Sequence, residues 1–137
     1  MTYYNTFKAK TQLKTSPFFE RTSKLNQSQE WRRWSGYLSA TNYELNHENE
    51  YFAIRTKSAL LDISPLYKYL IEGPDAMTFL DKLVTRNIKI CKVGQVMYTP
   101  WCDEEGKVID DGTVQRLSDN KFRITSAEPN FEWLQLN

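Results

Sequence analysis

Two adjacent carboxylates, Asp110 and Asp111, lie in the middle of the β-branched stretch EEGKVIDDGTVQRL. Strands usually avoid aspartate, because its short side chain competes for backbone hydrogen bonds and packs poorly on a pleated surface. Neighbouring strand residues point to opposite faces of the sheet. One aspartate can therefore face solvent or cap the neighbouring turn while the other lies on the opposite face, and only one of the two need be functional. Burying an unpaired carboxylate is costly or raises its pKa, so a buried aspartate here implies a partner or a ligand.

Tyr98 is the partner that the hairpin geometry suggests. If residues 103–106 form a four-residue loop, with Gly106 at a positive φ, then Tyr98 faces Asp111 across the hairpin. The Cβ atoms of such a pair lie about 4.5 to 5.5 Å apart, so a phenol and a carboxylate would share one face of the sheet. A change of one residue in the loop would bring Asp110 to Tyr98 instead. The plainest alternative is a solvent-facing aspartate pair on an edge strand.

The surrounding pattern predicts an α+β fold in which helices flank an antiparallel sheet. Residues 67–72 alternate as a strand does, and residues 74–87 carry apolar side chains at helical spacing behind a proline that suits a helix start. Three later strands are joined by short links of turn-forming residues, so they should form an antiparallel meander. The predicted helices span 27–34, 46–57, 74–87 and 129–137, and the predicted strands span 67–72, 94–102, 107–117 and 121–127.

Residues 1–26 lack sustained periodicity, and we expect an irregular N-terminal arm followed by one folded portion over residues 27–137. The helix at 27–34 should end at Gly36, which tolerates the left-handed conformation. The aromatic cluster between residues 31 and 37 should pack the arm onto the body of the protein. The alternative is an exposed apolar surface that drives self-association.

The composition is that of an ordinary soluble domain. The 137 residues carry a net charge of +1, which gives no electrostatic case for binding nucleic acid or an anionic membrane. No apolar run approaches the roughly 18 to 20 residues needed to span a bilayer. Cys91, Cys102 and the single histidine, His47, have neither a disulfide-scaffold spacing nor a zinc spacing. We therefore expect no metal site and a reducing, cytoplasmic location.

An ordered series of short motifs between Glu50 and Ala127 resembles the N-terminal part of the folate-binding aminomethyltransferase family, the glycine cleavage T-protein and its relatives. No motif is diagnostic alone, and the order and spacing of the motifs carry the resemblance. They are Glu50, Ala53 and Arg55; Asp62, Ser64 and Lys68; GPDA at 73–76 with its helix; Gly94 and Gln95; YTP at 98–100; and EGKVIDD at 105–111.

The resemblance implies a tetrahydrofolate-dependent one-carbon transferase that moves an aminomethyl or methyl carbon. It makes Asp111 the catalytic or cofactor-orienting residue, and it places Tyr98 and Ser126 in the folate pocket beside Asp111. A fixed carboxylate can hydrogen-bond a pterin N–H and stabilise positive charge that develops on nitrogen at the reacting centre. The partners implied are folate, a methylated or aminomethyl donor and a carrier protein.

The chain also departs from the family pattern. Gln115 stands where a tyrosine is frequent, and residues 125–127 read Thr-Ser-Ala where the family commonly has V-N-A with the asparagine on the pterin. These differences favour a divergent branch that acts on another methylated amine or ether. The family's later domains do not occur in these residues, so we expect an incomplete fragment that binds tetrahydrofolate weakly and is inactive alone. The alternative is a non-catalytic folate-binding or protein-interaction module.

Overall fold

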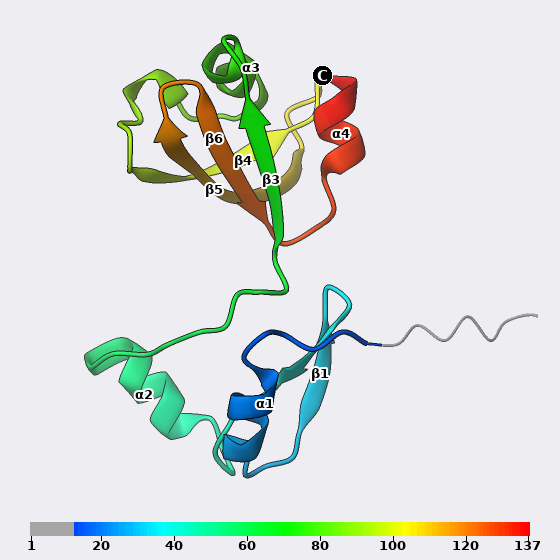
Figure 1. The fold of residues 1–137 in the computed structure, drawn as a ribbon, viewed down its shortest axis with the longest axis vertical. Helices are drawn as coiled ribbons and strands as arrows, with labels where there is room; N and C mark the ends of the chain where they lie inside the picture. Colours follow the sequence, from blue (N-terminus) through cyan, green and yellow to red (C-terminus); the bar gives the residue numbers. More distant parts are fainter. Residues whose placement is uncertain (1–12) are drawn as a thin grey trace, which may run out of the picture. The chain divides into compact units, whose positions relative to one another are not determined.

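The computed structural model describes residues 13–137, and the chain divides into two compact units, Met1–Pro65 and Leu66–Asn137 (Figure 1). The predicted arm lies partly outside the described residues. Its described part contains helix α1 (Phe19–Thr22) and the 3₁₀-helix η1 (Ser23–Leu25). None of the helices between residues 13 and 137 has the length and apolar character of a membrane span.

A β-hairpin in the first unit replaces the helix predicted at 27–34. Strand β1 (Trp31–Trp34) pairs antiparallel with strand β2 (Tyr37–Ala40). The two residues between the strands, Ser35 and Gly36, have φ angles of 46° and 83°. Positive φ at both central residues characterises the type I′ turn, whose twist matches that of paired strands. The helix prediction is wrong because Gly36 is the second residue of this turn and not a helix cap.

Helix α2 (Glu48–Thr56) confirms the helix predicted at 46–57, with slightly narrower bounds. Glu50, the first residue of the motif series, accepts hydrogen bonds from the backbone N–H groups of Tyr43 (2.6 Å) and Glu44 (3.2 Å). Its carboxylate thus ties the preceding chain to the first turn of the helix, where the helix dipole also favours a negative charge. Within this unit, Glu50 has a structural role.

The second unit is a four-stranded antiparallel sheet with the strand order β3–β6–β5–β4 (Figure 1). Strands β4, β5 and β6 form the predicted meander because only short turns connect them. Strand β3 pairs with β6, so the first and last strands of the unit are neighbours. The strands are β3 (Tyr67–Glu72), β4 (Val96–Cys102), β5 (Val108–Ser118) and β6 (Lys121–Ser126), and all four were expected from the sequence.

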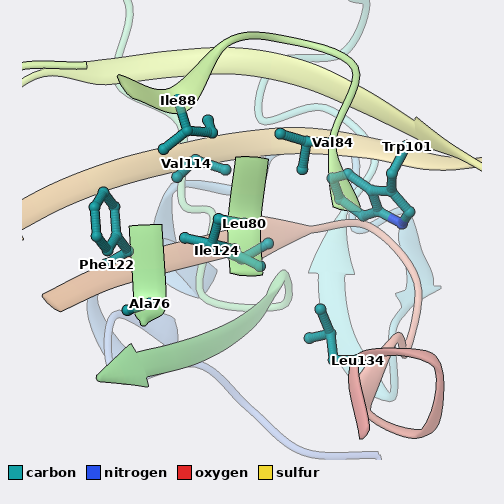
Figure 2. Close-up of a cluster of buried hydrophobic side chains, with 9 residues drawn as sticks. All are labelled: Ala76, Leu80, Val84, Ile88, Trp101, Val114, Phe122, Ile124 and Leu134. Carbon is teal, nitrogen blue, oxygen red and sulfur yellow. The ribbon is translucent and has the colours of Figure 1, made fainter. Parts of the chain in front are cut away.

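One face of this sheet carries the core of the unit, which Figure 2 shows. Helix α3 (Ala76–Leu83), the 3₁₀-helix η2 (Ile88–Ile90) and helix α4 (Phe131–Leu136) contribute to it. The helical spacing predicted for α3 is confirmed, since its apolar stripe is the part of the helix that is buried. The buried side chains of the cluster are Ala76, Leu80, Val84, Ile88, Trp101, Val114, Phe122, Ile124 and Leu134.

The other face of the sheet is exposed, and we call it the open face. Strand alternation places Leu70, Val96, Tyr98 and Asp111 on it, because neighbouring residues such as Met97, Thr99 and Asp110 are buried on the opposite face. Leu70 and Tyr98 are each 56% exposed. The open face is therefore a partly apolar, solvent-exposed surface of the sheet.

Gly112 marks a close approach between β5 and β6. A Cβ atom built at this position would lie 2.0 Å from the carbonyl oxygen of Thr125, which is backbone and cannot rotate away. Glycine in a strand commonly marks such an approach of two backbones. The glycine that follows the aspartate pair is therefore required by the spacing of these two strands.

We expect Gly112→Ala to lower the free energy of unfolding by about 1 to 3 kcal/mol, because the strands must separate to admit the methyl group. Urea denaturation followed by tryptophan fluorescence measures the change. Thr113→Ala, at the next position of the same strand, is the control and should cost less than about 1 kcal/mol. An unchanged denaturation midpoint for Gly112→Ala would contradict the close approach.

Candidate functional site

The loop between β4 and β5 is one residue longer than predicted, since the strand bounds leave residues 103–107 between them. Asp103 organises this loop. Its Oδ1 accepts hydrogen bonds from the backbone N–H groups of Glu105 (3.0 Å) and Lys107 (2.8 Å). Gly106 has a φ of 80°, which is the positive angle that the sequence argument assigned to it.

A β-bulge at Ile109 follows the loop. Cys102 pairs with Val108, but the next pair joins Trp101 to Asp110, so Ile109 is an extra residue on β5. The longer loop and the bulge each move the register by one residue. Because side chains alternate between the faces with a period of two, the combined shift of two leaves each later β5 residue on its predicted face.

Tyr98 and Asp111 therefore share the open face, although they are not direct partners. Tyr98 pairs with Thr113, and Asp111 pairs with Pro100, which corrects the predicted direct pairing of Tyr98 with Asp111. Diagonal neighbours on one face remain within reach of long and aromatic side chains. The Tyr98 hydroxyl donates a hydrogen bond of 2.8 Å to Asp111 Oδ2.

This hydrogen bond changes the acidity of the phenol. It raises the pKa of Tyr98 above the ordinary value of 10.0, and partial desolvation and the negative charge of Asp111 act in the same direction. Tyr98 therefore remains a donor at neutral pH and holds one oxygen of the carboxylate. Among the described residues, the second oxygen of Asp111 accepts no hydrogen bond, which leaves it free to accept one from a ligand.

Asp110 points to the core face and is 8% exposed. Its Oδ2 accepts hydrogen bonds from the Asn130 side chain (2.7 Å) and the Glu128 backbone N–H (3.2 Å), and its Oδ1 accepts one from the Asp111 backbone N–H (2.8 Å). The Trp101 indole N–H donates to Asn130 Oδ1 at 3.3 Å. Asp110 thus has the partners that a buried carboxylate requires.

Ser126 also points to the core face, opposite Gly112, and is 1% exposed. Its hydroxyl donates a hydrogen bond of 3.0 Å to the Glu128 carbonyl oxygen. The predicted set of site residues is therefore divided by the sheet. Tyr98 and Asp111 lie together on the open face, whereas Ser126 lies on the opposite face.

Asn130 is the polar residue of this region that the sequence reasoning missed. It immediately precedes α4, where asparagine usually caps the helix, but its side chain makes no capping hydrogen bond. The side chain is instead used in the core by Asp110 and Trp101, and the Asn130 backbone N–H donates to the Tyr69 hydroxyl at 2.7 Å. The sequence offered one indication of this role, because a buried aspartate such as Asp110 needs a hydrogen-bond donor.

A cavity of about 750 Å³ lies elsewhere in the second unit. It is bounded by the end of α3, the 103–107 loop and α4, with Lys82 and Trp133 among its lining residues, and neither Tyr98 nor Asp111 lines it. Its charged groups belong to the hairpin loop and to α3, and they include both signs. The aspartate and tyrosine pair is therefore a site on the exposed surface of the sheet.

Comparison with known proteins assigns the chain to a protein family. Residues 18–137 match the family described as the GCVT N-terminal domain. The chain belongs to this family, and the resemblance inferred from the motif series is confirmed.

The matched relatives are longer proteins. Over 130 residues the chain is 34% identical to an aminomethyltransferase of Halothermothrix orenii, and the match covers 91% of this chain and 35% of that protein. Over 87 residues it is 44% identical to a trimethylamine-oxide aldolase of Ruegeria pomeroyi, covering 63% of this chain and 11% of that protein.

The fold is also similar to a crystal structure of the glycine cleavage system aminomethyltransferase T from Bartonella henselae. The TM-score is 0.77 at 26% identity, over 90% of this chain and 35% of that one. The chain thus spans about a third of the length of the aminomethyltransferases that it matches.

We expect Asp111→Asn to lower the pKa of Tyr98 toward 10.0, because the substitution removes the negative charge and the strong acceptor that favour the protonated phenol. Nuclear magnetic resonance of ring-labelled tyrosine measures the titration, and Tyr98→Phe assigns the signal. Asp119→Asn, at an exposed aspartate paired with Arg116, is the control. A Tyr98 pKa that is the same with and without the Asp111 carboxylate would contradict the hydrogen bond.

Proposed function

We propose that this chain is the folate-facing N-terminal part of a tetrahydrofolate-dependent one-carbon transferase, which moves an aminomethyl or methyl carbon. The observation that carries the proposal is the hydrogen bond of 2.8 Å between Tyr98 and Asp111 on the open face. It presents a carboxylate of fixed orientation beside a half-exposed aromatic ring. Family membership supplies the class of reaction, and this pair supplies groups that suit it.

The residues present fit a pterin ring. Asp111 accepts hydrogen bonds only, so its second oxygen suits a ring N–H, and Tyr98 offers an exposed aromatic surface against which a flat ligand can lie. Ser126 does not fit a direct contact, because its hydroxyl is buried and bonded on the other face. Thr125, its neighbour, lies across from Thr113 on the open face and is the better candidate for a polar contact.

Bound tetrahydrofolate would supply the nitrogen that takes up the one-carbon unit. Asp111 would orient that nitrogen and stabilise positive charge that develops beside it, without forming a covalent bond. Tyr98, by donating to Asp111 Oδ2, would keep the carboxylate from rotating and leave its other oxygen pointed at the ligand. Both groups stand on adjacent strands of one sheet, which limits their movement.

The carbon donor that we propose is an N-methylated amine. The chain departs from the family pattern at Gln115 and at residues 125–127, and Gln115 and Thr125 lie on the open face. Identity reaches 44% over the stretch shared with the trimethylamine-oxide aldolase of Ruegeria pomeroyi. A carboxylate on an exposed face also suits a substrate that carries a positive charge on nitrogen.

Tetrahydrofolate should bind this chain weakly, since an open face leaves most of the ligand in water. In an amide-resolved magnetic resonance titration, we expect the signals of Tyr98, Asp111 and Thr113 to move and those of the core face to stay. Asp111→Asn should weaken binding about tenfold, the effect of one lost charge-assisted hydrogen bond, and Asp119→Asn should leave it unchanged. Signal shifts confined to the core face, or tight stoichiometric binding measured by calorimetry, would be evidence against weak binding of tetrahydrofolate on the open face.

The same substitution separates a transferase from a non-catalytic folate-binding or protein-interaction module. The matched part of this chain can be joined to the remainder of the Halothermothrix orenii aminomethyltransferase, in place of the segment that it matches. We expect Asp111→Asn in that protein to slow transfer about 100-fold, as removal of one preorganised group commonly does. Equal transfer rates would favour the non-catalytic module.

A further inference from the structure

Asp111 lies at the end of the paired region between β5 and β6. The ladder between β5 and β6 begins at Gly112, opposite Ser126, so Asp111 is one residue beyond it. On the other side, the β4 partner of Asp111 is Pro100, whose carbonyl oxygen accepts hydrogen bonds from the Thr85 backbone N–H (3.1 Å), the Thr85 hydroxyl (3.1 Å) and the Thr99 hydroxyl (3.0 Å). Asp111 is therefore paired with β4 but lies beyond the last residue pair of β5 with β6.

The side chain of Asp110 accepts a hydrogen bond from the backbone N–H of Asp111. Its Oδ1 lies 2.8 Å from the Asp111 backbone nitrogen, while its Oδ2 accepts from the Asn130 side chain at 2.7 Å and from the Glu128 backbone N–H at 3.2 Å. Asn130 is 4% exposed and is held in turn by the Trp101 indole. A buried network thus reaches from the start of α4, through one carboxylate, to the backbone of the next residue.

We propose that Asp110 is the positioning residue for Asp111: its buried carboxylate, held by Asn130 and Glu128, fixes the backbone of Asp111 so that the second carboxylate meets the Tyr98 hydroxyl on the open face. The inference rests on the proposed role of Asp111 in folate binding and transfer. Asp110 touches neither Tyr98 nor the open face, so it acts through Asp111. The two aspartates are a unit in which the first orients the second.

The use of both oxygens makes this proposal sensitive to an isosteric change. Asp110 serves the Asp111 N–H with Oδ1 and two other donors with Oδ2. An asparagine has one acceptor oxygen, so in either orientation it turns an N–H group toward a donor. Asp103 provides a matched control in the same hairpin, because both of its acceptor bonds use Oδ1 and an asparagine can keep both.

The titration of Tyr98 reports the position of Asp111 without any ligand. In the 137-residue chain, we expect Asp110→Asn to lower the Tyr98 titration midpoint by at least about half of the drop that Asp111→Asn produces, although residue 110 lies on the opposite face. Asp103→Asn should leave the midpoint unchanged. A folded Asp110→Asn protein with an unchanged midpoint, or an equal drop in Asp103→Asn, would overturn the proposal.

Exchanging the two side chains tests the hydrogen bond that Asn130 donates to Asp110. In the double variant Asp110→Asn with Asn130→Asp, the new carboxylate at 130 can accept from the new amide at 110, which frees the oxygen of that amide for the Asp111 N–H. We expect the Tyr98 midpoint to return part of the way to that of the unsubstituted protein. A midpoint no higher than that of Asp110→Asn alone would contradict the pairing.

Hydrogen exchange in the unsubstituted protein gives a test that does not depend on the folding of any variant. The Asp111 amide should exchange more slowly than the amides of the 103–107 loop, because its proton is held by a buried acceptor. Exchange at the rate of that loop would overturn the proposal. None of these measurements uses folate, so failed folate binding with a shifted Tyr98 midpoint would refute the proposed function and leave the role of Asp110 intact.

Discussion

The register of one hairpin decides which of two adjacent carboxylates reaches the open face of the sheet. A loop of residues 103–107 and an extra residue at Ile109 each shift the pairing of β4 with β5 by one position. Either irregularity alone would place Asp110 beside Tyr98 and turn Asp111 toward Trp101 and the core. Because both occur, the shift is even, and the phenol and the carboxylate of residue 111 lie within a hydrogen bond of 2.8 Å.

The core side of the sheet explains why the sequence needs both aspartates. Asp110 is buried there with three donors, among which the Asn130 side chain links it to Trp101 and to the start of α4. Fully satisfied polar networks in a low-dielectric interior are stiff, whereas half-satisfied ones are costly. The network thus hydrogen-bonds the part of β5 that precedes its pairing with β6, and through the Asp111 N–H it reaches the residue that bonds to Tyr98 on the other face.

Sequence patterns predicted much of this arrangement because its periodicities are local. The alternation of β3, the apolar stripe of α3 and the turn-rich links of the meander need no knowledge of distant contacts. The hairpin at 31–40 was missed because WRRW fits a helix about as well as a strand, and the Ser35–Gly36 turn alone decides between them. Ser126 was assigned to the folate pocket by resemblance to the family. A resemblance suggests the role of a residue, but it does not show on which face of the sheet the side chain lies.

The remaining features depend on contacts between residues that are far apart in the chain. The bulge at Ile109 leaves no signature in a β-branched run, and the burial of Asp110 depends on Asn130, twenty residues later. The close approach at Gly112 is likewise set by the Thr125 backbone of another strand. Turn length and bulges are thus the weakest part of a prediction from sequence, although an even error in register leaves the face assignment correct.

The most direct test of the register is the pattern of nuclear Overhauser effects between α-protons across β4 and β5. Residues that form a non-hydrogen-bonded antiparallel pair have Cα atoms about 4.5 Å apart, which brings their α-protons into close contact. The structure predicts a strong effect between the α-protons of Tyr98 and Thr113. A strong effect between Tyr98 and Gly112 instead would mean an odd shift, with Asp110 on the open face, and would contradict the account.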